Sequence, residues 1–252
     1  MSGTLAIIGG SGLTELPGLT ISVAHDIQTP FGPPSAPVLE GELNGLRLLF
    51  IARHGHGHPH KIPPHLVNYR ANLWALQKLY ATDVIAVNAV GGITKNMKPG
   101  VLVSPAQIID YSFSRESTIF DGQFAPLSNI DFSFPYTEAL RVQLLKSAAT
   151  VEEKVINGGV YGVSQGPRLE TAAEIFRMER DGCDIAGMTG MPEACLAREL
   201  KLNFASLALV VNAAAGKGAA AITLKQIDDH LGTGMQRVRL ILSQLVQDFY
   251  QS

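Results

Sequence analysis

Short runs of apolar residues recur along the chain, and segments with a different spacing of apolar positions separate them. Several of the runs are apolar at consecutive positions, which is typical of strands that are covered on both faces. Such runs predict the strands of a buried central sheet. They lie at 5–8, 46–52, 84–88, 160–164, 184–188 and 204–212.

Between and after these runs, apolar residues stand three or four positions apart, as on one face of a helix. Leu66, Tyr69, Leu73, Leu76 and Tyr80 form one such stripe. The clearest pattern extends from Leu224 to Phe249 and predicts a long amphipathic helix at the C-terminal end. Further helices are expected at 137–150, 171–181 and 193–200.

Strands that alternate with helices indicate an α/β protein. We predict one domain over residues 1–252, with a mixed, largely parallel central sheet flanked by helices. A chain of 252 residues, 46% of them hydrophobic, is long enough to bury such a core. The longest stretch without either pattern is 112–135, and loops of that length usually cover a site or a subunit contact.

Charge and cysteine content narrow the classes of function. The formal net charge of −2 disfavours nucleic acid or an acidic membrane surface as a partner. Charged residues make up only 17% of the chain, which favours a homo-oligomer. Cys183 and Cys195 fit neither a redox pair nor a zinc site and are typical of thiols in a reducing cytoplasm. We expect no secretory leader, and no apolar run approaches the ~20 residues of a membrane helix.

The segment Gly-Met-Thr-Gly-Met-Pro-Glu, at 187–193, joins a predicted strand to a predicted helix. The N–H groups at a helix N-terminus suit an anion, and the Thr189 hydroxyl adds a donor. Pro192 is expected at the first helical position, where its missing N–H has no cost. The alternative interpretation is that Thr189 only caps the helix.

Two further turns suit an anion. Ile-Ile-Gly-Gly-Ser-Gly, at 7–12, lacks the third glycine of a dinucleotide-binding fingerprint because Glu15 stands there. Its backbone N–H groups and the Ser11 hydroxyl suit an oxyanion, with a plain tight turn as the alternative. Arg53 and His54 follow the second strand as two adjacent donors, and the planar fork of arginine matches phosphate. The alternative there is an ordinary surface arginine.

The other strand ends suit a polar heterocycle or a sugar. Asn-Ala-Val-Gly-Gly, at 88–92, lets backbone approach a ligand closely. Glu170, in Gln-Gly-Pro-Arg-Leu-Glu-Thr at 165–171, either favours the next helix N-terminus or recognises a ligand. Asn212 ends the most apolar strand, and ligands of α/β sheets bind at the carboxyl ends of strands. These signals together predict an enzyme that handles a small oxyanion and a polar heterocycle or sugar.

Histidines are concentrated in one segment. His54, His56, His58, His60 and His65 are five of the seven in the chain. Histidines at alternate positions can hold a metal, but no Asp, Glu or Cys lies within the run, and its glycines and prolines indicate a loop. We expect no metal site here, and a histidine-loop metal-binding protein is the alternative from another class.

The motifs at 7–12, 88–92, 165–171 and 187–193 resemble those of the trimeric purine nucleoside phosphorylase and methylthioadenosine phosphorylase family. So do Ala-Arg-His-Gly at 52–55 and Val-Asn-Tyr-Arg-Ala-Asn-Leu-Trp-Ala-Leu at 67–76. The resemblance runs in order over nearly the whole chain. It implies a homotrimer in which phosphate splits a purine nucleoside into free base and sugar 1-phosphate, with no metal or organic cofactor.

The resemblance also implies roles residue by residue. Leu169 falls where the family often has a phenylalanine against the base. Phosphate would be held by Ser11, Arg53, His54, the Ala89 backbone and Thr189, the ribose would lie on Met188, and the purine would face Leu169, Glu170, Asn212 and Ala214.

Four positions, two of them new, bear on the choice of nucleoside. The Glu170 carboxylate accepts from the N1–H of a 6-oxopurine and repels the bare N1 of adenine. Asn212, where adenine-directed relatives have aspartate, is the expected catalytic donor to N7 of the departing base. Leu224 and Ile227 make the 5' end of the sugar site apolar, where inosine-guanosine phosphorylases tend to place a histidine.

The expected reaction is therefore phosphorolysis of S-methyl-5'-thioinosine to hypoxanthine and 5-methylthioribose 1-phosphate. Phosphorolysis of methylthioadenosine, or of inosine and guanosine, is the alternative within the family. A nucleoside sensor without catalysis is a further alternative.

Overall fold

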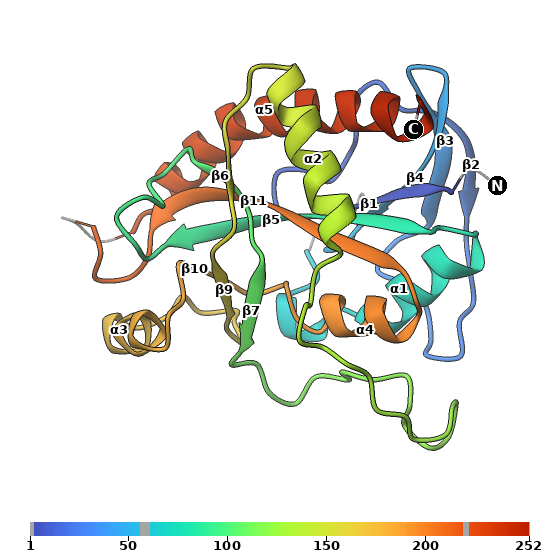
Figure 1. Ribbon diagram of the computed structural model, residues 1–252. Helices are drawn as coiled ribbons and strands as arrows, with labels where there is room; N and C mark the ends of the chain where they lie inside the picture. The colour runs from blue at the N-terminus through green and yellow to red at the C-terminus, as the bar shows by residue number, and fades with distance from the viewer. Residues whose placement is uncertain (1–2, 56–60, 219–221, 252) are drawn as a thin grey trace.

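The computed structural model describes residues 3–55, 61–218 and 222–251 (Figure 1). Within them lies an 11-stranded sheet. Its strands are β1 (Leu5–Gly9), β2 (Thr20–His25), β3 (Val38–Leu43), β4 (Leu46–Ala52), β5 (Asp83–Gly92), β6 (Leu102–Ser104), β7 (Gln107–Asp110), β8 (Val155–Asn157), β9 (Val160–Val163), β10 (Ile185–Gly187) and β11 (Asn203–Ala213). The helices are α1 (Tyr69–Lys78), α2 (Glu138–Thr150), α3 (Ala172–Arg180), α4 (Glu193–Glu199) and α5 (Leu224–Gln251), with a 3-10 turn at Pro64–Leu66.

The main path of the sheet is β2-β3-β4-β1-β5-β10-β9-β7, and β11, β6 and β8 branch from β5. β1 pairs in parallel with β4 and β5, and the pairs β5–β11, β9–β10, β7–β9 and β6–β8 are parallel too. The four other pairings are antiparallel. This confirms the predicted mixed, largely parallel sheet flanked by helices.

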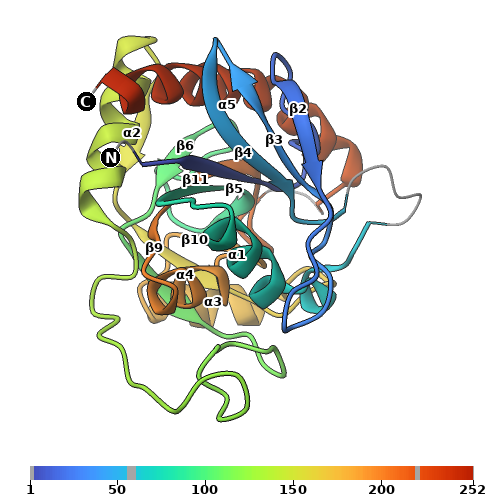
Figure 2. The same ribbon diagram turned by 90° about the vertical axis from the view of Figure 1, so that its right-hand side faces the viewer.

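Helices cover both faces of the sheet. α2 and α5 pack on one face, and α1 and α4 lie on the other (Figure 2). Successive residues of β1 point to opposite faces of the sheet. Ile7 packs with the α2 and α5 side chains, and Ile8 packs with those of α1 and α4. This explains why the run is apolar at every position. Although α5 has 28 residues, no helix in the described part of the chain combines the length and hydropathy needed to cross a membrane.

Five strands were missed by the sequence prediction. The side chains of β2 are exposed at five of its six positions, so it has no buried run to detect. β3 joins β2 to the main sheet, while β6, β7 and β8 have only three or four residues each. The irregular stretch predicted at 112–135 is confirmed, because it contains neither helix nor strand.

The topology brings several strand ends to one edge. β1, β4 and β5 are parallel neighbours, so the turns that follow them lie side by side. β11 runs parallel to β5 in register from Asn203–Asp83 to Val210–Val90, where a bulge shifts the pairing so that Asn212 lies opposite Gly91. Bulges next to active sites often redirect a side chain. Gly91 has no side chain in the way: a Cβ there would lie 3.3 Å from Nδ2 of Asn212.

Candidate active site

A cleft of about 310 Å³ opens where these strand ends meet. Every predicted ligand-facing residue with a described side chain lines it, although the residues come from seven separate segments. The side chain of Leu224 lies outside the described residues. The lining includes Ser11, Arg53, His54, Ala89, Leu169, Glu170, Met188, Thr189, Asn212, Ala214 and Ile227.

Arg53 is the most deeply placed charge of the cleft. Its side chain is 1% exposed and forms a bidentate ion pair with Glu193, which is fully buried at the start of α4. The Nη2–Oε2 distance is 2.9 Å, and Nη1 donates to the carbonyl oxygen of Val87 at 2.9 Å. Burial opposes the charge on Arg53, but the Glu193 carboxylate outweighs it and raises the pKa of Arg53. The surface-arginine interpretation is therefore wrong.

Three of the five Arg53 N–H groups are used by these bonds, which leaves two for a ligand. The glycine turn after β1 makes room for this head group, since a Cβ on Gly10 would lie 2.6 Å from Nη1 of Arg53. Leu13 N donates to the Gly10 carbonyl at 3.0 Å, and Gly12 has a φ of +82° that suits glycine. Ser11, which is half-buried, follows Gly10 in that turn and lines the same cleft as Arg53.

Thr189 belongs to a chain of buried hydrogen bonds. Ser206 donates its hydroxyl to Oδ1 of Asn88 at 2.7 Å, and Nδ2 of Asn88 donates to Oγ1 of Thr189 at 2.8 Å. Oγ1 accepts from Asn88, and the Thr189 side chain also lies within hydrogen-bonding reach of the Tyr161 hydroxyl, so its hydroxyl hydrogen can be donated to Tyr161 or to a ligand. The capping alternative is wrong, since the N-cap of α4 is Pro192 and has no side-chain cap bond. The helix begins at Glu193, so Pro192 is not at the first helical position either.

The backbone of Ile62 fixes the orientation of the His54 ring. Its Nδ1 lies 2.7 Å from the carbonyl oxygen of Ile62, which can only accept, so Nδ1 carries a hydrogen. Burial, followed by the nearby Arg53 charge, lowers the pKa of His54 to about 4. The ring is then neutral at pH 7, and its Nε2 is an acceptor. This differs from the expected pair of adjacent donors.

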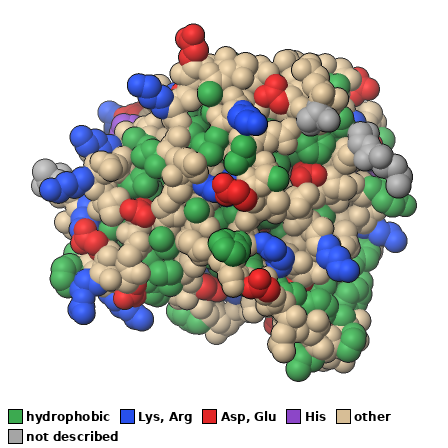
Figure 3. Space-filling view, in the orientation of Figure 1, with side chains coloured by type: hydrophobic (Ala, Val, Ile, Leu, Met, Phe, Trp, Pro, Cys, Tyr) green, Lys and Arg blue, Asp and Glu red, His purple; other side chains and the backbone are tan. Residues whose placement is uncertain are grey.

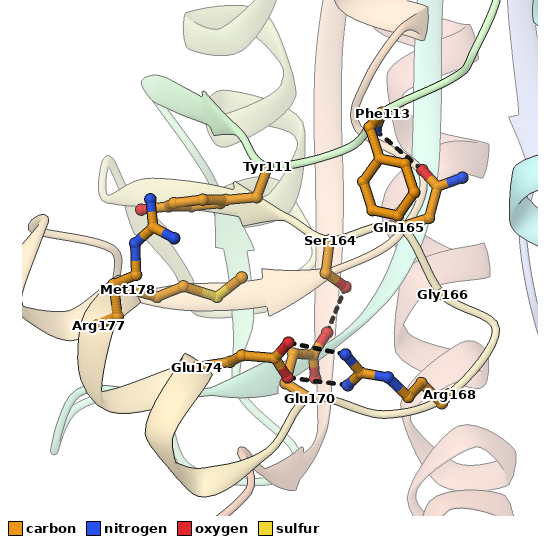
Figure 4. A pocket seen from close by; sticks show the side chains of 10 residues that line it. All are labelled: Tyr111, Phe113, Ser164, Gln165, Gly166, Arg168, Glu170, Glu174, Arg177 and Met178. Atoms are coloured by element: carbon orange, nitrogen blue, oxygen red, sulfur yellow. Dashed lines mark hydrogen bonds and ion pairs between the residues drawn. The ribbon is translucent and has the colours of Figure 1, made fainter.

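Glu170 lies on the rim between this cleft and an adjoining cavity of about 210 Å³ (Figure 4). It accepts a hydrogen bond from the Ser164 hydroxyl. Glu170 does not cap α3: Thr171 is the N-cap, and Glu174 completes the capping box. Leu169 beside it is 43% exposed.

Asn212 also lines the cleft and is half-buried. Its Nδ2 donates to the carbonyl oxygen of Ala213 at 2.7 Å, which leaves one N–H and the amide oxygen for a ligand. Ala214 is buried next to it, and Ile227 and Leu231 of α5 close the wall.

Two residues of this site were missed by the sequence prediction. The sequence marks Glu193 only as a helix start, although a carboxylate beside Ala194 and Leu196 is an unusual side chain for a buried helix. Arg115 lies in the irregular stretch at 112–135, where no pattern singled it out.

Arg115 connects two loops that contribute residues to the cleft, the one with Glu170 and the one with Thr189. It donates to the carbonyl oxygens of Met188 (2.8 Å), Met191 (2.6 Å), Ser164 (3.1 Å) and Gln165 (2.7 Å). One side chain therefore fixes the spacing between the Glu170 loop and the Thr189 loop.

The histidine-rich segment is only partly described. His56, His58 and His60 lie outside the described residues. In the ranges that are described, no three His, Cys, Asp or Glu side chains are placed to hold a metal ion.

Comparison with known proteins gives consistent matches. The model of the phosphorylase superfamily matches residues 4–247. A probable S-methyl-5'-thioinosine phosphorylase of Pseudomonas syringae pv. tomato is 52% identical and covers 96% of this chain and 97% of its own. A 6-oxopurine nucleoside phosphorylase of Pyrococcus furiosus is 40% identical, covering 88% and 84%. The solved methylthioadenosine phosphorylase of Schistosoma mansoni in complex with adenine has a TM-score of 0.93 at 29% identity, covering 99% and 93%.

Proposed function

The chain belongs to the phosphorylase superfamily, and from that premise we propose that it is a pentosyltransferase of purine salvage. It splits S-methyl-5'-thioinosine with phosphate into hypoxanthine and 5-methylthioribose 1-phosphate. The observation that carries this proposal is one cleft with an anion-suited end at Arg53 and a base-suited end at Glu170.

Phosphate binds at the anion end. The two remaining N–H groups of Arg53, the hydroxyls of Ser11 and Thr189 and the backbone N–H of Ala89 donate to its oxygens. His54 Nε2 accepts from the P–OH of the monoprotonated phosphate dianion, which fits its neutral form. Charge-assisted bonds of this kind are the strong ones, and Glu193 keeps the guanidinium oriented for them.

The reaction joins a phosphate oxygen to C1' of the sugar while the C1'–N9 bond breaks. The electron pair of that bond leaves with the purine, and positive charge develops on the ribosyl ring. The phosphate anion stabilises that ring, whose carbon skeleton lies on Met188. A donor placed where the purine becomes negative stabilises the transition state, and the free N–H of Asn212 supplies it at N7.

The substrate is selected at the other groups of the cleft. Glu170 accepts from N1–H of the 6-oxopurine, as the family resemblance implies, and Leu169 covers the base. Ile227 lines the cleft and makes the 5' end apolar for the methylthio group, a role that the sequence also predicts for Leu224. Leu231 supports the same wall, since it lines the cleft beside Ile227.

The assembly proposed is a homotrimer that acts in the cytoplasm with phosphate as co-substrate and no added cofactor. Support for assembly comes from the 112–135 segment, where Phe113, Leu127 and Phe134 are 66%, 82% and 72% exposed. Hydrophobic side chains gather over this segment at the lower right of Figure 3. Large exposed apolar patches favour a protein partner. Cys183 and Cys195 are both free thiols, which fits a reducing compartment.

The test is direct product analysis. The protein is incubated with S-methyl-5'-thioinosine with and without phosphate, after treatment with a chelator, and products are separated by chromatography. We expect equal amounts of hypoxanthine and 5-methylthioribose 1-phosphate, formed only with phosphate. Hypoxanthine without phosphate would indicate a hydrolase, loss of activity with the chelator would indicate a metal enzyme, and binding without cleavage would indicate a sensor.

A further inference from the structure

Ser164 is a polar neighbour of Glu170 for which the proposed reaction has no role so far. Its hydroxyl donates to Oε1 of Glu170, and Figure 4 shows the two side chains pointing toward each other. Ser164 directly follows β9, so the sheet places it. Its backbone N–H donates to the Gly187 carbonyl of β10 at 2.8 Å.

The other side of the Ser164 backbone is held by Arg115. Nη2 of Arg115 donates to the Ser164 carbonyl at 3.1 Å and to the Gln165 carbonyl at 2.7 Å. The Ser164 backbone is therefore fixed by a strand and by a guanidinium, and its hydroxyl lies next to Glu170 and, at 3.4 Å, to the Gly187 carbonyl.

The charged neighbours of Glu170 are engaged elsewhere. Arg168 forms two hydrogen bonds with Glu174, at 2.7 Å and 2.8 Å. Glu174 also caps α3 through Thr171. Among the described residues, the hydrogen bond that orients the Glu170 carboxylate is the one from Ser164.

We propose that Ser164 is a positioning residue that determines the choice between 6-oxopurine and 6-aminopurine nucleosides. Its bond occupies Oε1 of Glu170 and leaves Oε2 to accept from N1–H of the oxopurine. With an aminopurine, the Glu170 oxygen faces the unprotonated N1. Both atoms carry lone pairs and repel each other, and the bond from Ser164 prevents the carboxylate from rotating to relieve that repulsion. Without the Ser164 hydroxyl, the carboxylate rotates more freely. The hydrogen bond from N1–H of the oxopurine is then weakened, and the repulsion of N1 of the aminopurine is reduced.

This inference rests on the proposed function, and its test compares Ser164→Ala with Ser164→Thr. The readout is the ratio of kcat/KM for S-methyl-5'-thioinosine to that for methylthioadenosine, at saturating phosphate. Because a hydrogen bond to a charged group is lost, Ser164→Ala should lower the ratio roughly tenfold. Ser164→Thr keeps a hydroxyl and should keep most of the ratio, and the KM for phosphate should stay near wild type in both.

A matched control is Ser133→Ala. Ser133 makes the same kind of bond, donating to Oδ1 of Asp131 at 2.7 Å, in an exposed loop outside the cleft. It should leave the ratio unchanged. In a Glu170→Ala background, Ser164→Ala should have no further effect on the ratio, which a general structural defect would not reproduce. Calorimetric binding of free hypoxanthine and free adenine gives the same comparison without turnover.

An unchanged ratio in Ser164→Ala would overturn the inference while leaving the proposed function intact. So would an equal loss in Ser164→Thr, or a full effect of Ser164→Ala in the Glu170→Ala background. Failure of the wild-type protein to cleave either nucleoside would overturn both.

Discussion

The two ends of the cleft differ in how firmly their side chains are held. At the anion end, Arg53, Glu193 and Thr189 are buried, and each has a partner from a distant segment. At the base end, Leu169 is 43% exposed and Asn212 donates only to the carbonyl of the next residue. One end is part of the core, and the other is close to the surface.

This difference indicates at which positions of the cleft a substitution should leave the fold intact. Preorganised donors stabilise a transition state because they need no rearrangement during the reaction, and burial in the core supplies that rigidity. Leu169 and Asn212 lack such long-range bonds, so we expect substitutions of these two residues to alter ligand preference without disturbing the fold, whereas Glu170 is oriented by Ser164.

Among the substitutions considered, Glu193→Gln should cause the largest loss of stability. It leaves the Arg53 charge buried without its counter-ion, and breaking a buried pair costs about 3–5 kcal/mol. Chemical denaturation measures the free energy of unfolding. Glu174→Gln, which breaks the exposed pair with Arg168, is the control and should have little effect. Equal losses in the two variants would show that the anion end is no more firmly held than the surface.

Titration of His54, at the anion end of the cleft, should make the stability of the protein depend on pH. The folded protein keeps His54 neutral down to a pKa of about 4, while the unfolded chain takes up a proton near 6.5. Stability is therefore fully present above pH 6.5 and falls as the pH drops to 4. Over that window, His54→Gln should lose less stability than wild type, by on the order of 3 kcal/mol. Melts at several pH values test this, with His230→Gln as control; parallel curves for wild type and His54→Gln would contradict it.

Asn212→Asp should change the substrate without changing phosphate binding. The carboxylate no longer donates to N7 of either base, which slows both reactions. It also accepts from the exocyclic amine of adenine and repels O6 of hypoxanthine, so the ratio of kcat/KM for methylthioinosine to methylthioadenosine should fall roughly 100-fold. The KM for phosphate should stay near wild type, and the exposed Asn96→Asp should change neither value. A large rise in the phosphate KM would mean that the two ends are not separable.

Leu169→Phe should have the smallest effect. An aromatic ring at this half-open position stacks on the base and lowers the nucleoside KM by roughly threefold. Leu240→Phe on the exposed face of α5 is the control. A higher nucleoside KM would show that this part of the base end is too tightly packed to accept a ring.

The same contrast explains what could be predicted from the sequence. Buried strands such as β4 and β11 leave continuous apolar runs, and residues at their ends, such as Arg53 and Asn212, could be expected to converge. The amphipathic pattern of α5 likewise predicts a long helix from local spacing alone. β2 could not be found because its exposed side chains leave no apolar signal.

Partners separated by long stretches of chain also escaped prediction. Glu193 pairs with Arg53 across 140 residues, and Ser206 reaches Asn88 across 118. No local spacing encodes such a contact. Arg115 was hidden for a different reason: its partners are backbone carbonyls, which any sequence provides.

The central claim is that this cleft pairs phosphate-dependent cleavage with selection of a 6-oxopurine carrying an apolar 5' group. The most direct test is steady-state kcat/KM for S-methyl-5'-thioinosine, methylthioadenosine and inosine at saturating phosphate. We expect methylthioinosine to exceed each of the others by about tenfold or more, since mismatched polar groups and lost apolar contacts both reduce turnover. Faster cleavage of methylthioadenosine than of methylthioinosine would contradict the role given to Glu170, and with it the account of the base end.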